Sequence, residues 1–215
     1  MLRYDSEKYA LLNTPIETDR HVARVIRYLD PQADDRVLEV GCGRGFLTRR
    51  IQLLAPHTCG IDINPQCIVH AVAPALRVMD AIDLQFEDEQ FDKVYSFHAI
   101  EHIERADLAM REIHRVLAPG GRALLVYPAE PIRGLYAMPG AWLGFGNPLK
   151  ARELHVHRFT PRKLAAVAEA NCLVHVSSAF SLFITPQFLT LVARAPVARR
   201  APRAKRRTVA GAAAQ

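Results

Sequence analysis

The segment V-L-E-V-G-C-G-R-G, residues 37–45, constrains the fold of this chain more than any other stretch. Its apolar first half predicts a short strand buried on both faces. Three glycines follow at alternate positions, and helical spacing resumes from Phe46 to Ile51. A strand, a glycine turn and a helix present backbone N–H groups and the positive helix end to a ligand. Glycine lets the chain turn sharply and lets a ligand approach where a Cβ would obstruct it.

The spacing of these glycines and the position of two acids narrow the kind of ligand. Dinucleotide dehydrogenases usually carry G-x-G-x-x-G, whereas this chain has G-x-G-x-G with Glu39 two positions before the first glycine. Downstream, the segment C-G-I-D-I (59–63) predicts a second strand ending at Asp62, about twenty residues on. A carboxylate at that position suits hydrogen bonds from ribose hydroxyls. The strand, the glycines and the placed acid together predict a ribose-containing ligand.

Strands and helices alternate along the chain, which predicts an α/β fold of parallel crossover units with helices on both faces of the sheet. Ligands of such sheets lie at the carboxyl ends of the strands. Gly41, Asp62, Asp80 and the pair Phe97-His98 all fall at predicted strand ends. The predicted strands are 37–40, 58–62, 75–79, 91–97, 122–127, 172–178 and 188–193, and the predicted helices are 17–29, 46–54, a short one from Asn64-Pro65, 106–117 and 160–170.

Five segments in this order resemble the class I S-adenosylmethionine-dependent methyltransferases that act on small molecules and lipids. They are E-V-G-C-G-R-G (39–45), Asp62, M-D-A (79–81) followed by Phe86, F-D-K-V-Y-S (91–96) and R-E-I-H-R-V-L-A-P-G-G (111–121). The resemblance runs from about residue 37 to residue 128. It implies a Rossmann-like, doubly wound seven-stranded sheet, mostly parallel with an antiparallel last strand. It also implies an enzyme that transfers a methyl group, with O-methylation weakly favoured.

The cofactor implied by this resemblance is S-adenosyl-L-methionine. The residues that match the family motifs are therefore expected to contact it. The glycine turn would admit the amino-acid portion and Glu39 would hold its ammonium. Asp62 would bind the ribose, while Asp80 and the Ala81 backbone N–H would contact the adenine edge. The full set of predicted cofactor residues is Glu39, Gly41, Cys42, Gly43, Gly45, Asp62, Ile63, Asp80, Ala81 and Phe97.

Three residues after the fourth strand, His98, Glu101 and His102, are the predicted catalytic residues, because the family's acceptor site lies there. Spacings of three and four place them on one face if the segment is helical. A histidine there can act as a base toward a hydroxyl acceptor or contact the substrate. A divalent metal that orients an acceptor oxygen, and a structural role, are the alternatives. Some quinone-type relatives hold a metal here, but His98 replaces an acid, so we assign no metal ligand.

Prolines and glycines dominate residues 128–158 and predict no regular element there. We interpret this segment as a cap over the substrate pocket, the alternative being a surface excursion. His155 and His157 could face the pocket or lie exposed. The remaining histidines, at positions 21, 57, 70, 114 and 175, belong to no constellation and are expected at helix surfaces or strand edges. The predicted organisation is a methyltransferase domain at 1–195 and a basic, disordered tail at 196–215.

The charge of the chain resides in that tail. The net charge is +6, and six basic residues (Arg199, Arg200, Arg203, Lys205, Arg206, Arg207) account for it. The tail can give weak attraction to membranes or nucleic acid, but it lacks the aromatics of a specific nucleic-acid site. Four cysteines without a C-x-x-C pair, and no leader or membrane-spanning stretch, predict a cytoplasmic protein.

The expected partner is a small-molecule or lipid-like methyl acceptor, because the cap is apolar and aromatic. Three other functions stay open: a nicotinamide-dependent oxidoreductase, a non-catalytic S-adenosylmethionine-binding protein, and methylation of RNA assisted by the tail. The sequence leaves the oligomeric state open.

Overall fold

The computed structural model describes residues 7, 10, 18–182 and 186–196. In this part of the chain the strands form one seven-stranded sheet in the order β3-β2-β1-β4-β5-β7-β6. Strands β3, β2, β1, β4 and β5 are parallel to one another, while β7 runs antiparallel to both β5 and β6. The predicted Rossmann-like, doubly wound sheet with an antiparallel last strand is therefore confirmed.

The elements follow the predicted alternation, with most bounds within a few residues of the prediction. Strand β5 begins earlier than predicted, because Leu117 already pairs with Phe91 across an irregularity in the ladder. The helices and strands are α2 (Thr18–Leu29), β1 (Val37–Val40), α3 (Phe46–Ile51), β2 (Thr58–Asp62), α4 (Pro65–Val69), β3 (Leu76–Val78), β4 (Phe91–Phe97), η1 (Ile100–His102), α5 (Ala106–Val116), β5 (Leu117–Pro128), α6 (Met138–Phe145), η2 (Pro148–Lys150), α7 (Ala151–Leu154), α8 (Pro161–Ala170), β6 (Leu173–Ser181) and β7 (Gln187–Arg194).

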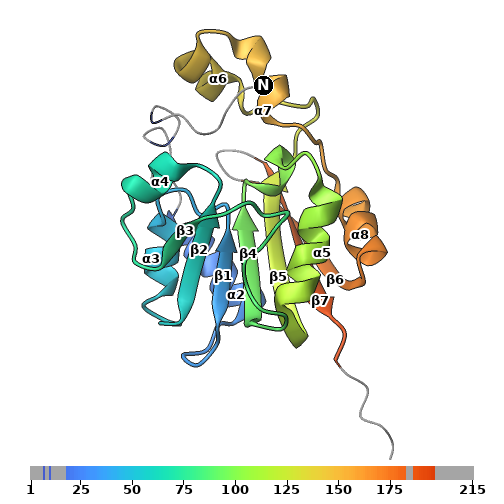
Figure 1. The fold of residues 1–215 in the computed structure, drawn as a ribbon. Coiled ribbons are helices and arrows are strands. Elements are labelled where there is room, and N and C mark those ends of the chain that lie inside the picture. The colour runs from blue at the N-terminus through green and yellow to red at the C-terminus, as the bar shows by residue number, and fades with distance from the viewer. Residues whose placement is uncertain (1–6, 8–9, 11–17, 183–185, 197–215) are drawn as a thin grey trace, which may run out of the picture.

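Helices lie on both sides of the sheet (Figure 1), and each side has its own core. Successive strand residues point to opposite faces. Val94 therefore packs on the side of α5 and α8, while Tyr95 packs with α2 and α3. The central strands read as continuous apolar runs because both of their faces are buried.

Two helix starts follow directly from the sequence. The Asn64 side chain accepts a hydrogen bond from the Gln66 N–H, and Pro65 occupies the first helical position of α4. Thr160 caps α8 in the same way, by accepting from the Lys163 N–H. Both are the expected combination of a polar cap and an early proline.

The cap segment, residues 128–158, differs from the prediction. It contains α6, η2 and α7, so the expectation of no regular element there is wrong. Burial of Ala141, Ala151 and Leu154 in a small core of their own outweighs the low helix propensity of the local prolines and glycines. Figure 1 shows α6 and α7 at the top of the view, beyond the carboxyl ends of the central strands.

The tail predicted at 196–215 lies outside the described residues, apart from Pro196. Among the helices that the structure describes, none combines the length and apolar character needed to cross a bilayer.

Candidate active site

Backbone hydrogen bonds join the carboxyl ends of β1, β2 and β3. The N–H groups of Gly41 and Cys42 both donate to the Ile61 carbonyl, at 2.9 and 2.8 Å. The Gly43 N–H donates to the Asp62 carboxylate at 2.7 Å, and the Met79 N–H donates to the Asp62 carbonyl at 3.0 Å. The glycine turn, Asp62 at the end of β2 and the segment after β3 thus form one connected edge, as the sequence predicts.

Asp62 is held in place by backbone donors on both of its carboxylate oxygens. Its second bond comes from the Asn64 N–H at 2.9 Å. Burial raises the pKa of Asp62, and the bonds from Asn64 and Gly43 oppose that rise. A carboxylate has about four acceptor sites, so Asp62 can accept from further donors besides these two backbone N–H groups.

Packing inside the protein leaves no room for a side chain at Gly41, independently of any ligand. Its φ is +75°, and a Cβ built on it would lie 2.3 Å from the Ala99 Cβ. Ala99 lies just before η1, in residues 98–102, which carry the predicted catalytic residues and which we call the acceptor segment after their predicted role. The glycine turn at residues 41–45, which we call the cofactor turn after its predicted role, is therefore in direct contact with the acceptor segment at Gly41.

Glu39 lies at the centre of β1 and is buried. The Thr48 hydroxyl on α3 and the Tyr95 hydroxyl on β4 both donate to its Oε2, the latter at 3.1 Å. Burial raises the pKa of Glu39 to about 8, although these two hydrogen bonds oppose the rise. A cation that approaches this carboxyl would favour its ionised form.

The other predicted cofactor residues differ in what they can offer. The Cys42 side chain is buried against Gly60, so only its backbone can face a ligand. Ile63 is exposed directly after Asp62, as a residue that packs on a base would be. Asp80 fixes its own turn by accepting from the Ile82 N–H at 3.1 Å. The remaining members, Gly45, Ala81 and Phe97, lie at the start of α3, in the turn after β3 and at the end of β4.

The structure brings His98, Glu101 and His102 together. His98 has φ +53°, a conformation that non-glycine residues rarely adopt outside functional sites and turns. Its Nδ1 lies 3.5 Å from Glu101 Oε1, and His102 Nε2 lies 4.0 Å from the same oxygen. Burial raises the pKa of Glu101, but His98 and His102 outweigh it, so its net pKa lies below the ordinary value.

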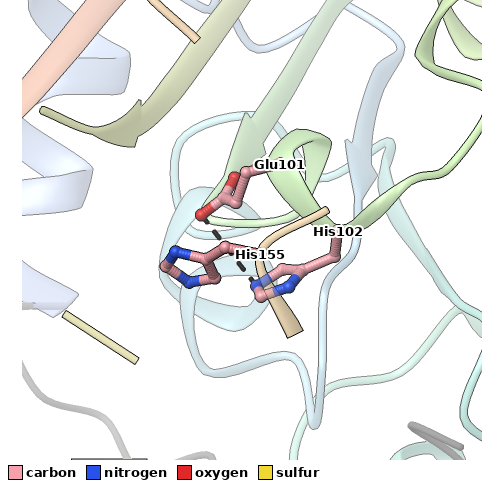
Figure 2. A group of neighbouring side chains, drawn as sticks. All are labelled: Glu101, His102 and His155. Atoms are coloured by element: carbon pink, nitrogen blue, oxygen red, sulfur yellow. Dashed lines mark ion pairs between the residues drawn. The ribbon is translucent and has the colours of Figure 1, made fainter. Parts of the chain in front are cut away.

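The cap segment meets these residues through two histidines. His155 is buried, and its Nδ1 lies 2.7 Å from Glu130 Oε1. Its ring centroid is 4.8 Å from that of His102 (Figure 2). His157 instead points its Nε2 at the Glu104 carbonyl, at 3.0 Å, and its backbone N–H donates to the Glu101 carbonyl at 3.0 Å. His155 thus faces the acceptor segment, whereas His157 attaches the cap to it.

Two residues of this region are not identified by the sequence. His21, expected at a helix surface, lies on α2 with its ring 4.5 Å from Phe97 and 6.1 Å from His98. Burial, followed by the charges of His98 and Arg24, lowers the pKa of His21 to about 3, so it is neutral. Glu130 has no motif of its own. Only tertiary structure places these two side chains beside the site.

The strand order, the glycine turn after β1 and the acid at the end of β2 are those of the class I methyltransferase fold. Residues 38–125 match the family model described as "Methyltransferase domain". Over these residues, which are less than half of the chain, the protein is similar to the methyltransferase family, and S-adenosylmethionine is the cofactor that this similarity supports.

Relatives and solved structures agree with this assignment. The malonyl-[acyl-carrier protein] O-methyltransferase of Erwinia billingiae is 25% identical over 168 residues, which cover 76% of this chain and 61% of the relative. The probable phthiotriol/phenolphthiotriol dimycocerosates methyltransferase 2 of Mycobacterium ulcerans is 38% identical over 118 residues, which cover 49% and 45%. This chain thus spans less than two thirds of the length of either relative.

Among solved structures, the geranyl diphosphate C-methyltransferase of Streptomyces coelicolor A3(2), in complex with Mg²⁺, geranyl diphosphate and S-adenosyl-L-homocysteine, superimposes with a TM-score of 0.66. The match covers 87% of this chain and 82% of that one at 14% identity, so it supports the fold alone.

Proposed function

We propose that this protein transfers a methyl group from S-adenosylmethionine to a small-molecule or lipid-like acceptor, with an oxygen as the favoured methyl-accepting atom. One observation carries the proposal. The Gly43 N–H of the glycine turn donates to Asp62, the acid that ends the next strand, β2, at 2.7 Å. This bond fixes the two elements predicted to hold the methionine portion and the ribose relative to each other.

Methyl transfer from a sulfonium is an in-line displacement with a good leaving group. The protein therefore contributes chiefly by aligning the acceptor and excluding water. His98, Glu101 and His102 follow β4, next to the glycine turn through the contact of Ala99 with Gly41. A neutral imidazole at this position can accept the proton of a hydroxyl acceptor. This arrangement supports O-methylation over transfer to carbon or nitrogen.

The cap segment supports an apolar acceptor. Trp142, Leu143 and Leu149 are 66%, 65% and 69% exposed, although large apolar side chains are usually buried. They lie in the substrate cap proposed at residues 128–158. Apolar side chains gathered in one segment favour contact with an acyl or prenyl chain.

We also propose a cytoplasmic location. Cys42 and Cys67 are buried thiols, and the four cysteines form no disulfide within the described residues. Reduced thiols are typical of cytosolic proteins.

Calorimetry with S-adenosylmethionine and S-adenosylhomocysteine tests cofactor binding. Single turnover with methyl-labelled cofactor and a panel of hydroxylated apolar acceptors tests transfer. Label in an ether or ester product supports the proposal. Folded protein that gives no binding heat with either compound would overturn it, and binding without transfer to any acceptor would favour the non-catalytic alternative.

A further inference from the structure

The sequence alone assigns no metal ligand to Glu101 or His102, but the structure adds His155 to them, and the three side chains form one cluster. One ligand atom from each lies within 4.8 Å of the others. Figure 2 shows the three side chains pointing toward one another, two from η1 and one from the end of the cap segment. The end of the cap thus meets a segment far from it in the sequence, and the Leu154 carbonyl contacts His102 at the same place.

Glu101 is the least satisfied of these groups. It is 2% exposed, and within the described structure neither of its carboxylate oxygens has a hydrogen-bond partner. Its nearest basic atoms are His98 Nδ1 at 3.5 Å and His102 Nε2 at 4.0 Å. A buried ionised carboxylate without hydrogen bonds is costly, and a bound cation is one of the few groups that stabilise it.

Both histidines are held in the orientation that a metal ligand requires. The His102 Nδ1 lies 2.7 Å from the Leu154 carbonyl, which can only accept, so Nδ1 carries the proton and Nε2 the lone pair. The His155 Nδ1 lies 2.7 Å from Glu130 Oε1, which assigns its lone pair to Nε2 in the same way. Metal-binding histidines typically donate their other N–H to a carbonyl or a carboxylate.

Glu130 is itself fixed by the cap. Its oxygens accept from the Gly134 N–H at 2.6 Å and the Tyr136 N–H at 3.2 Å, and its side chain is buried. The outer partner of His155 therefore has little freedom, and neither does the imidazole that it orients.

We propose that Glu101, His102 and His155 bind a divalent transition-metal ion of the zinc class. Two imidazole nitrogens and one carboxylate are a common zinc donor set, which leaves a fourth position for water or an acceptor oxygen. Tetrahedral bonds of about 2.0–2.1 Å separate ligand atoms by roughly 3.4 Å. The ligand atoms, all within 4.8 Å of one another, therefore approach by at most about 1.4 Å when the ion binds. The ion joins the cap segment to the segment after β4.

Zinc binding by the full chain, freed of metal with a chelator, tests this site directly. Titration of Zn²⁺ against a competing indicator should give one tightly bound ion per chain. Glu130→Gln should weaken binding by roughly 10–100-fold, as expected for an outer partner, and His155→Ala should weaken it more. His157→Ala is the matched control, because this neighbouring imidazole points at Glu104, and it should leave the dissociation constant unchanged.

Cobalt substitution and thermal melting make the test independent of activity and of folding defects. Bound Co²⁺ should show the spectrum of nitrogen and oxygen ligands without a thiolate band, which excludes Cys42 and Cys67. Zinc should raise the melting temperature of the wild type, since it binds the folded state, and not that of a folded His155→Ala variant. A folded wild type that binds no zinc, equal affinity in His155→Ala, or a thiolate spectrum would each overturn the proposal. Because these readouts need neither cofactor nor acceptor, the metal site and the methyltransferase activity stand or fall separately.

Discussion

Substitution of Gly41 by alanine tests the contact between the cofactor turn and the acceptor segment. Two penalties add at this position. The φ of +75° places an alanine in the left-handed region, which costs about 1–2 kcal/mol. The new Cβ lies 2.3 Å from the Ala99 Cβ, so one of the two segments must move by more than an ångström. Such overpacking typically costs about 1–3 kcal/mol. The free energy of unfolding should therefore fall by about 2–5 kcal/mol.

Gly120→Ala is the matched control. Gly120 has φ +84°, nearly the same conformation, but a Cβ there meets no described atom within 4 Å. The effect of alanine on the entropy of the unfolded chain is common to both variants and cancels in the comparison. The difference between them isolates the clash with Ala99, which should amount to about 1–3 kcal/mol.

Urea denaturation followed by circular dichroism measures both variants under the same conditions. The Gly41→Ala variant should also bind S-adenosylmethionine more weakly than Gly120→Ala, because the displaced turn carries the Gly43 N–H. Equal losses of stability in the two variants would refute the claim that Gly41 is packed against the acceptor segment.

Three further predictions concern the cofactor and the acceptor. Asp62→Asn should weaken S-adenosylmethionine binding by about 1–3 kcal/mol through loss of hydrogen bonds to a charged group, and an unchanged calorimetric dissociation constant would contradict the ribose assignment. Burial raises the pKa of Glu39 to about 8, so the carboxyl is largely protonated at lower pH. The cofactor ammonium favours the ionised carboxylate, so cofactor affinity should increase with pH up to about 8, by at most about tenfold per pH unit. Calorimetry from pH 6 to pH 8 measures this slope, and Glu39→Gln should abolish it; an identical slope in the variant would rule Glu39 out. His102→Ala should reduce turnover more than cofactor affinity in single-turnover assays, and equal losses of both would indicate a structural role.

The parts of the fold that follow from local physics are well predicted from the sequence. The apolar runs identify the central strands, and the caps at Asn64 and Thr160 locate two helix starts. The same reasoning fails in α6, whose sequence contains Pro139, Gly140 and Gly144. There the packing of Ala141 within the cap, which no local pattern reveals, decides the structure.

The candidate site divides in the same way. The glycine turn and Asp62 are predictable because a motif fixes their positions at strand ends. Glu130 and His155 are 25 positions apart in the sequence, and His21 on α2 contacts Phe97 at the end of β4. Such contacts depend on how distant segments pack. The sequence therefore does not decide whether His155 faces the pocket or lies exposed, and it does not identify Glu130 or His21 as residues of the site.

The position of β7 has a consequence for how the chain matures on the ribosome. This strand lies between β5 and β6, so β6 has no neighbour in the sheet until residues 187–194 have emerged. Until then the Leu117–Pro128 strand presents an unpaired edge, and such edges recruit other chains. Nascent chains stalled before residue 187 should therefore aggregate. Once residues up to Arg194 have emerged, β7 can pair with β5 and complete the sheet, and the Arg194 guanidinium then donates to the Leu117 carbonyl at 2.7 Å.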